Sequence, residues 1–141
     1  MTTTAHVILA VISLAQQLSS TNSHLRQRET STNSAVALLA PFTPGVARAI
    51  EAVNAGPVEN DPATVSEDVP FWMTVRPWSR QVAGALTRAV QIAHQNGQPQ
   101  VGTSHVVLAI LEDPESAGLH LIRTLGGYTD ALRGQLQQRL Q

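Results

Sequence analysis

The feature that most constrains the fold of this chain is a short apolar motif that occurs twice. Residues 4–12 read TAHVILAVI and residues 103–111 read TSHVVLAIL, so Thr, His, Val, Leu and Ala coincide and most other positions stay aliphatic. The first copy has helical composition, with Leu and Ala and without Gly or Pro. The duplication predicts two short helical units that stack and so bury apolar faces that neither unit buries alone.

The rest of the first half of the chain also has the composition of helices and turns. Apolar helices are predicted over residues 4–18, 34–40 and 43–54, with a polar loop over residues 19–33. Pro41 is expected to end the second of these helices, because it lacks a backbone donor. Thr43 is the expected N-cap of the third, with Pro44 at its first position. The face of the third helix that is predicted to meet the core carries Val46, Ile50 and Val53.

The second half is also predicted to be helical. Helices are expected to begin at the caps Ser79, Thr103, Asp113 and Thr129, with Pro114 at the first position of the third. The first of these helices is the most clearly amphipathic and ends at the C-cap signal Asn96-Gly97. The residues predicted to face the core are Val82, Leu86, Val90 and Ala93 in the first helix and Leu132, Leu136 and Leu140 in the last.

A chain of 141 residues is long enough for one domain and too short for two independent cores of ordinary size. We therefore predict a single all-α module over residues 1–141, built from two tandem pseudo-symmetric helical repeats. The first repeat is placed at about residues 3–54, the linker at residues 55–77 and the second repeat at residues 78–141. The first repeat lacks its opening helix, because the counterpart of the helix at residues 79–96 would fall before Met1.

The composition excludes several classes of function. The formal net charge is −1 and the basic residues are scattered, so no nucleic-acid partner is expected. No apolar run reaches the roughly 20 residues that a membrane helix needs, and the apolar start lacks the basic region of a signal peptide. We therefore expect a soluble, cytoplasmic protein. No G-x-x-x-x-G-K-[ST] motif occurs, so the chain has no Walker A phosphate cradle and is not itself an ATPase.

The second half resembles a known family. The stretch PWSRQVAGALTRAVQIAHQNGQPQVGTSHVVLAILED, continuing through LIRTLGG to ALRGQLQQRL, is similar to the Clp amino-terminal domain, which occurs in front of Clp-type AAA+ unfoldases. The likeness is nearly complete over residues 77–141 and patchier over residues 3–53. It implies a recognition module for peptides, degrons or peptide natural products, including cyclic peptides, which acts as an adaptor or a decoy for a Clp unfoldase. Residues 41–50 look like the opening helix of a family repeat, so they are a candidate substitute for the missing one.

The resemblance also points to site residues. In the family, an aromatic residue after a Pro at the repeat junction lines a peptide-binding surface, and here Trp78 follows Pro77, with Arg80 one turn further. The family has a Glu between the Thr and the His of the motif, and this Glu is associated with phosphoarginine recognition. Ala5 and Ser104 stand there in this chain, so weak or absent phosphoarginine binding is expected.

Other candidate site residues come from residue types. Phe71, Trp72 and Trp78 form an aromatic cluster, which is either a lid over the core or a recognition patch. Thr4, Thr103 and Ser104 are primarily N-cap residues, and the alternative is that they bind a carboxylate or phosphate of a ligand at a helix N-terminus.

The histidines and serines do not form a recognisable metal or catalytic motif. The five histidines show no metal-ligand spacing and no Cys assists them, so neither a metal nor a cofactor is expected. His6 and His105 are expected to be buried and to fix a helix start by a hydrogen bond. Ser104 and His105 are adjacent in sequence and make no nucleophile–base pair, so we predict that the protein is not an enzyme and disfavour a small hydrolase. The remaining alternative is a structural module that completes its missing helix by forming a homodimer.

Overall fold

The computed structural model describes residues 2–20, 34–55, 59 and 78–140. Within these ranges the chain forms seven α-helices, one 3-10 helix and no strand, which confirms the all-α prediction. An isolated bridge joins Thr2 to Trp78. The elements are α1 (Thr4–Ser20), α2 (Ser34–Leu39), η3 (Ala40–Gly45), α3 (Val46–Ala55), α5 (Arg80–Gln95), α6 (Thr103–Glu112), α7 (Ala117–Thr124) and α8 (Thr129–Leu140).

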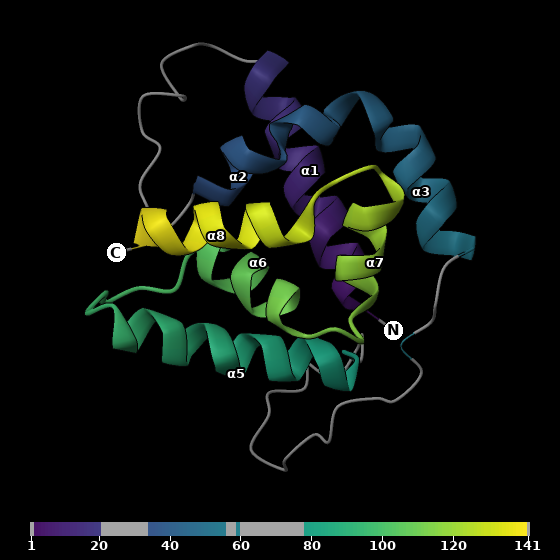
Figure 1. Cartoon of the computed structure of the whole chain (residues 1–141). Helices are drawn as coiled ribbons and strands as arrows, with labels where there is room; N and C mark the ends of the chain where they lie inside the picture. Colours follow the sequence, from purple (N-terminus) through teal and green to yellow (C-terminus); the bar gives the residue numbers. More distant parts are fainter. Residues whose placement is uncertain (1, 21–33, 56–58, 60–77, 141) are drawn as a thin grey trace.

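The two copies of the duplicated motif form the central helices α1 and α6. Each of them packs against the short helix of the other copy, α1 against α7 and α6 against α2. The last helix of each copy, α3 or α8, also packs on this core. Helix α3 contacts α1 and α7, whereas α8 contacts α6 and α2 (Figure 1). The largest fully buried apolar side chains are Ile8, Ile12, Leu39, Ile110, Ile122 and Leu136. The core therefore lies between two pseudo-symmetric units, and the short helix of each unit packs on the central helix of the other.

Helix α5 has no counterpart among the other described elements. It packs along α6, and the equivalent position on α1 is not taken by α3, because α3 packs as α8 does. Residues 41–50 form parts of η3 and α3, so they do not substitute for a missing opening helix. The outer side of α1 is consequently exposed at His6, Ala10 and Leu14.

Two predicted core faces are correct only in part: Val82 and Ala93 of α5 are buried as predicted, but one residue of each face is exposed. Val90 is 57% exposed and Ile50 is 48% exposed, whereas Ala89 and Ala49 beside them are fully buried. The remaining buried residues of α5 are Val82, Ala85, Ile92 and Ala93. Small side chains let helices approach closely, so in both helices an Ala rather than the larger aliphatic neighbour faces the core. The prediction for the last helix is confirmed, since Leu132, Leu136 and Leu140 are buried.

Two of the predicted helix ends of the second half are confirmed. Ser79 caps α5, with its Oγ accepting a hydrogen bond from the Val82 N–H at 3.2 Å. Asn96 is the C-cap of the same helix, and Gly97 follows with φ +66°, a conformation that favours glycine.

Other predicted helix starts are wrong by one to three residues. Gly102, not Thr103, is the N-cap of α6, and Ser116 caps α7 by accepting from the Leu119 N–H at 3.2 Å. Asp113 is instead the C-cap of α6. The helix before Pro41 ends as predicted, because α2 stops at Leu39 and the 3-10 helix η3 follows it. The next helix, α3, begins at Val46, so Thr43 is not its N-cap. Thr129 is the first residue of α8.

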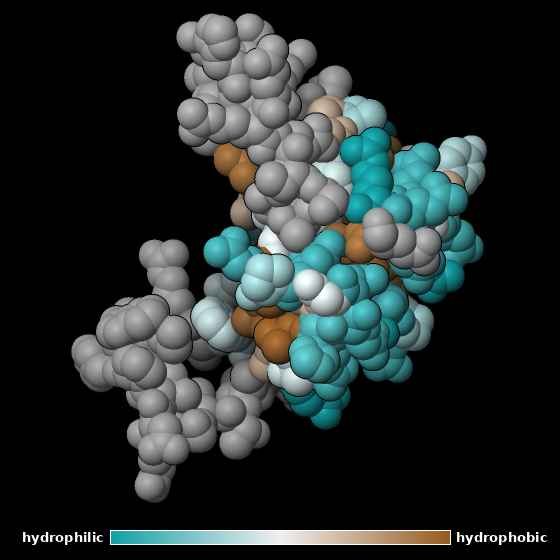
Figure 2. Space-filling view, turned by 90° about the vertical axis from the view of Figure 1, so that its left-hand side faces the viewer, coloured by the Kyte–Doolittle hydropathy of each residue, from teal (hydrophilic) through white to brown (hydrophobic). Residues whose placement is uncertain are grey.

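The surface of the described part is mainly polar. On the face that Figure 2 shows, hydrophilic residues cover most of the described surface and hydrophobic residues emerge in small patches between them. The large hydrophobic residues that are exposed are Leu14, Ile50, Trp78, Val90, Val101 and Tyr128. None of the helices described is long and apolar enough to cross a membrane.

Candidate functional site

The starts of α1, α5 and α7 meet around the carboxylate of Glu59, which is only 4% exposed. The Thr4 N–H and the Ser79 hydroxyl each donate to Oε1 at 2.7 Å, and the Ala117 N–H donates to Oε2 at 2.9 Å. The Thr4 hydroxyl also donates to Oε2 and itself accepts from the Gly118 N–H at 2.9 Å. A negative carboxylate is favourable at positive helix ends, so Glu59 ties together the starts of these helices.

Sequence reasoning placed Glu59 in an acidic linker and assigned it no role. Asp61, Glu67 and Asp68 follow it closely, so neither spacing nor composition distinguishes this carboxylate. Thr4 was expected to cap its own helix or to bind an external anion. In the structure its N–H and hydroxyl donate to Glu59 instead, so both donors of this buried residue are hydrogen-bonded within the protein.

Among the described residues, the matching cluster in the second copy is built on a hydroxyl group. The hydroxyl of Ser104 accepts from the Ala35 N–H and contacts the Ser34 hydroxyl, both at 3.1 Å. Ser104 therefore provides a hydrogen-bond acceptor for an N–H at the start of α2, as Glu59 does at the start of α7. The equivalent residue in α1 is Ala5, which has no side-chain acceptor, and Glu59 supplies the missing oxygen.

His105 fixes the start of α6, as predicted. Its Nδ1 accepts from the Gly102 N–H at 2.8 Å, its Nε2 contacts Oε1 of Gln98, and the residue is fully buried. This burial lowers the pKa of His105. His6 makes the same bond in α1, where its Nδ1 accepts from the Thr3 N–H at 3.1 Å, but His6 is exposed and so differs from the prediction.

A cleft of about 300 Å³ opens between α5, the end of α6 and the start of α7. Its lining residues are Thr4, Arg80, Gln81, Gly84, Ala85, Arg88, Ala109, Ile110, Glu112, Asp113, Glu115 and Ser116. Small and apolar residues therefore alternate with charges of both signs. This volume is at the lower limit of small-molecule sites and suits one or two side chains of a peptide.

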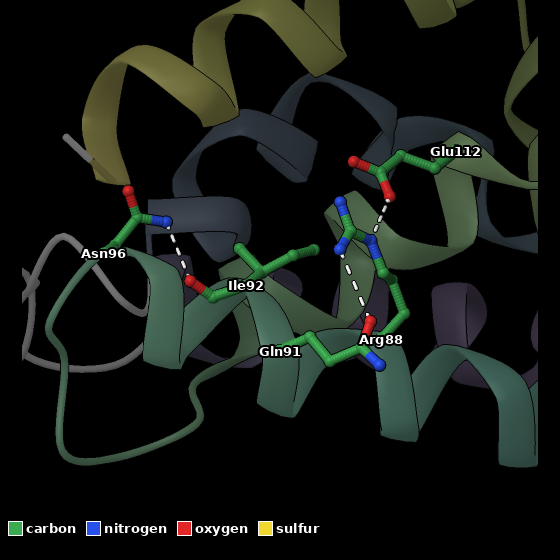
Figure 3. Close-up of polar contacts among 5 residues, drawn as sticks. All are labelled: Arg88, Gln91, Ile92, Asn96 and Glu112. Atoms are coloured by element: carbon green, nitrogen blue, oxygen red, sulfur yellow. Dashed lines mark hydrogen bonds and ion pairs between the residues drawn. The ribbon is translucent and has the colours of Figure 1, made fainter.

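An ion pair spans the walls of this cleft. Nε of Arg88 in α5 donates to Oε2 of Glu112 in α6 at 2.8 Å, and Figure 3 shows the Arg88 side chain between Glu112 and Gln91. The hydrogen bond to Glu112 and the charge of this residue raise the pKa of Arg88. A second wall residue, Gln81, has its Oε1 shielded from solvent with no hydrogen-bond partner in the part of the chain that is described.

The predicted site residues lie at two separate places. Thr4 and Arg80 line the cleft, and Trp78, 38% exposed, lies just before Arg80, where the Ser79 N–H donates to the Thr2 carbonyl at 2.8 Å. Thr103 and Ser104 lie at the other end of α6, roughly 8–9 Å along the helix axis from Ala109, the nearest α6 residue of the cleft. Phe71 and Trp72 lie outside the described residues. The described residues contain no group of three or more His, Asp or Glu side chains able to hold a metal ion.

These observations define a class of protein. It is an all-helical module with a duplicated central helix and a cleft beside the second repeat. Residues 78–141 match the Clp repeat (R) N-terminal domain family, which supports the assignment of this part of the chain to that family. The match covers α5 to α8 and includes Trp78 and the second copy of the motif. No curated protein and no solved structure gives a significant match to this chain.

Proposed function

We propose that this protein is a non-catalytic peptide-binding module of a Clp unfoldase–protease system, which works in the cytoplasm without a cofactor. It recognises degrons, hydrophobic peptides or cyclic peptide natural products and acts as an adaptor or decoy for a Clp unfoldase. The family of residues 78–141 supports the link to Clp proteins. The cleft lined by the start of α5, two residues after Trp78 in the chain, is the observation that carries the proposal of peptide binding.

The chemistry of the cleft fits a peptide segment. Gly84, Ala85 and Ala109 leave room for an apolar side chain of the ligand. Trp78 adds an exposed aromatic ring at the start of α5, and aromatic residues of this kind dominate many binding surfaces.

Phosphoarginine is a poor ligand for the two motif positions. Ala5 has no carboxylate, and Ser104 is fully buried and already bonded to the start of α2. A guanidinium is recognised best by two carboxylate oxygens, which neither position supplies. The proposed ligands are therefore apolar or cyclic peptides rather than phosphoarginine peptides.

Calorimetry with a hydrophobic cyclic peptide and with a phosphoarginine peptide tests this function. We expect measurable binding of the cyclic peptide only, and Trp78→Ala should weaken it by about 2 kcal/mol, roughly 30-fold. Tyr128→Ala is the matched control, because Tyr128 is 84% exposed and lies on the turn between α7 and α8. Tight binding of phosphoarginine together with an inert Trp78 would refute the proposed site.

A second candidate function is structural self-assembly. The exposed outer side of α1 favours it, because an apolar strip of this kind usually finds a partner. Light scattering at several protein concentrations distinguishes the two functions, since only self-assembly gives a mass that rises with concentration.

A further inference from the structure

The internal symmetry of the fold gives the outer side of α1 a direct reference surface. Each residue of the α1 motif has an equivalent in α6, and the third residue of both helices is a His whose Nδ1 accepts from the N–H three residues earlier. The equivalents of His6 and Ala10 are His105 and Ala109, which are 0% and 4% exposed. In α6 this side is covered by α5, whereas in α1 the same side is exposed.

The exposed strip on α1 consists of His6, Ala10 and Leu14, one residue for each turn. Leu14 is 39% exposed, and Leu9 and Ser13 beside the strip are half-buried. The ring of His6 has no hydrogen bond at Nε2 to any described residue, whereas Nε2 of His105 contacts Gln98, which follows α5. At His6 and Ala10 the strip therefore corresponds to the α6 surface, but without the helix and the polar partner that complete that surface.

The covering helix α5 shows what kind of element fits such a surface. Its buried side carries Ala85, Ala89 and Ala93, one small residue for each turn, with Val82 and Ile92 beside them. A small residue on each side allows two helices to approach closely, and Ala10 on α1 matches Ala109 on α6 in this respect. A bulky helix face would not reach the flanking half-buried residues.

We infer that the His6–Ala10–Leu14 strip of α1 docks an amphipathic α-helix supplied by another polypeptide, with a small residue at every fourth position of its contact face. The helix has the chemistry of α5 and lies on α1 as α5 lies on α6. A second copy of this chain is the less suitable occupant, because its own α5 is already packed on its α6. The strip is separate from the residues that line the cleft, so this inference does not depend on peptide binding there.

A labelled synthetic peptide with the sequence of residues 79–97 is the probe, titrated into the full chain and followed by fluorescence anisotropy. We expect saturable binding that Ala10→Glu weakens at least tenfold. Ala131→Glu is the matched control, because Ala131 is exposed on α8, and it should leave binding unchanged. A peptide with Leu in place of Ala85 and Ala89 should also bind at least tenfold more weakly.

Several outcomes would overturn the inference. If the wild-type chain does not bind the peptide, or if Ala10→Glu binds it equally well, the strip is not the docking surface. If sedimentation shows a homodimer that Ala10→Glu dissociates, a second copy is the occupant. Leu14→Glu provides a second test of the same strip if Ala10→Glu does not fold by circular dichroism.

Discussion

Replacement of the buried carboxylate of Glu59 tests how the starts of three helices are held together. In Glu59→Ala, the N–H groups of Thr4 and Ala117 lose their acceptor inside the protein. Each unpaired buried donor costs about 1–3 kcal/mol, so the expected loss is about 2–6 kcal/mol before any relaxation. The hydroxyls of Thr4 and Ser79 are left out of this sum because they can rotate towards other partners. The loss is a large share of the roughly 5–15 kcal/mol that stabilises a typical domain.

Urea unfolding followed by far-UV circular dichroism measures this loss. Glu59→Gln should lose less, about 1–3 kcal/mol, because its amide keeps one acceptor oxygen but turns N–H groups towards other donors. Glu115→Ala is the control, because Glu115 is exposed, and its free energy of unfolding should change by less than about 0.5 kcal/mol. If Glu59→Ala also stays within about 0.5 kcal/mol of the wild type, the carboxylate does not stabilise the helix starts, and the reasoning is wrong.

Two further predictions concern stability. Gly118→Ala should destabilise the fold by about 1–3 kcal/mol, because a Cβ would lie 2.8 Å from a methyl of Ile110 and 2.9 Å from the Thr4 carbonyl oxygen. Gly134→Ala should instead stabilise the fold by up to about 1 kcal/mol in the same urea assay, because a Cβ at this helical position meets no atom within 4 Å. Because burial lowers the pKa of His105, the unfolded chain binds more protons in mildly acidic solution, and the free energy of unfolding should fall as the pH drops from about 7.5 through about 6.5. His105→Gln should flatten this slope, whereas an unchanged slope would contradict its assignment to His105.

Much of the fold could be predicted from the sequence because the duplicated motif is a local signal. Helical composition and the repeated Thr, His and Leu positions identify α1 and α6 without any knowledge of their neighbours. The faces of α3 and α5 could not be predicted from hydrophobicity alone. Large aliphatic residues normally mark the core, but Val90 and Ile50 are exposed because adjacent alanines allow closer packing.

The candidate site was harder to predict because it depends on contacts between distant segments. Arg80 and Thr4 could be proposed from residue type, and both line the cleft. Ser104 and Thr103 were given mainly as capping residues with ligand binding as the alternative, and they lie at the opposite end of α6 from the cleft. The role of Glu59 follows only from the meeting of three helix starts, which no sequence spacing reveals.

The relation between Ala5, Ser104 and Glu59 leads to a last prediction, the rescue of one substitution by another. Ser104 accepts from the N–H at the start of α2, and the equivalent Ala5 lies near the start of α7, whose Ala117 N–H binds Glu59 instead. In a Glu59→Ala background, Ala5→Ser should therefore recover about 1 kcal/mol by offering its hydroxyl to Ala117.

In the wild-type background the same Ala5→Ser substitution should stabilise nothing, because the carboxylate already occupies that acceptor position. Urea unfolding of the wild type, both single variants and the double variant forms a double-mutant cycle, with an expected coupling energy of about 1 kcal/mol. Simple additivity of the two substitutions would show that Ala5 and Ser104 are not equivalent. It would also show that Glu59 does not stand in for a side chain that the first repeat lacks.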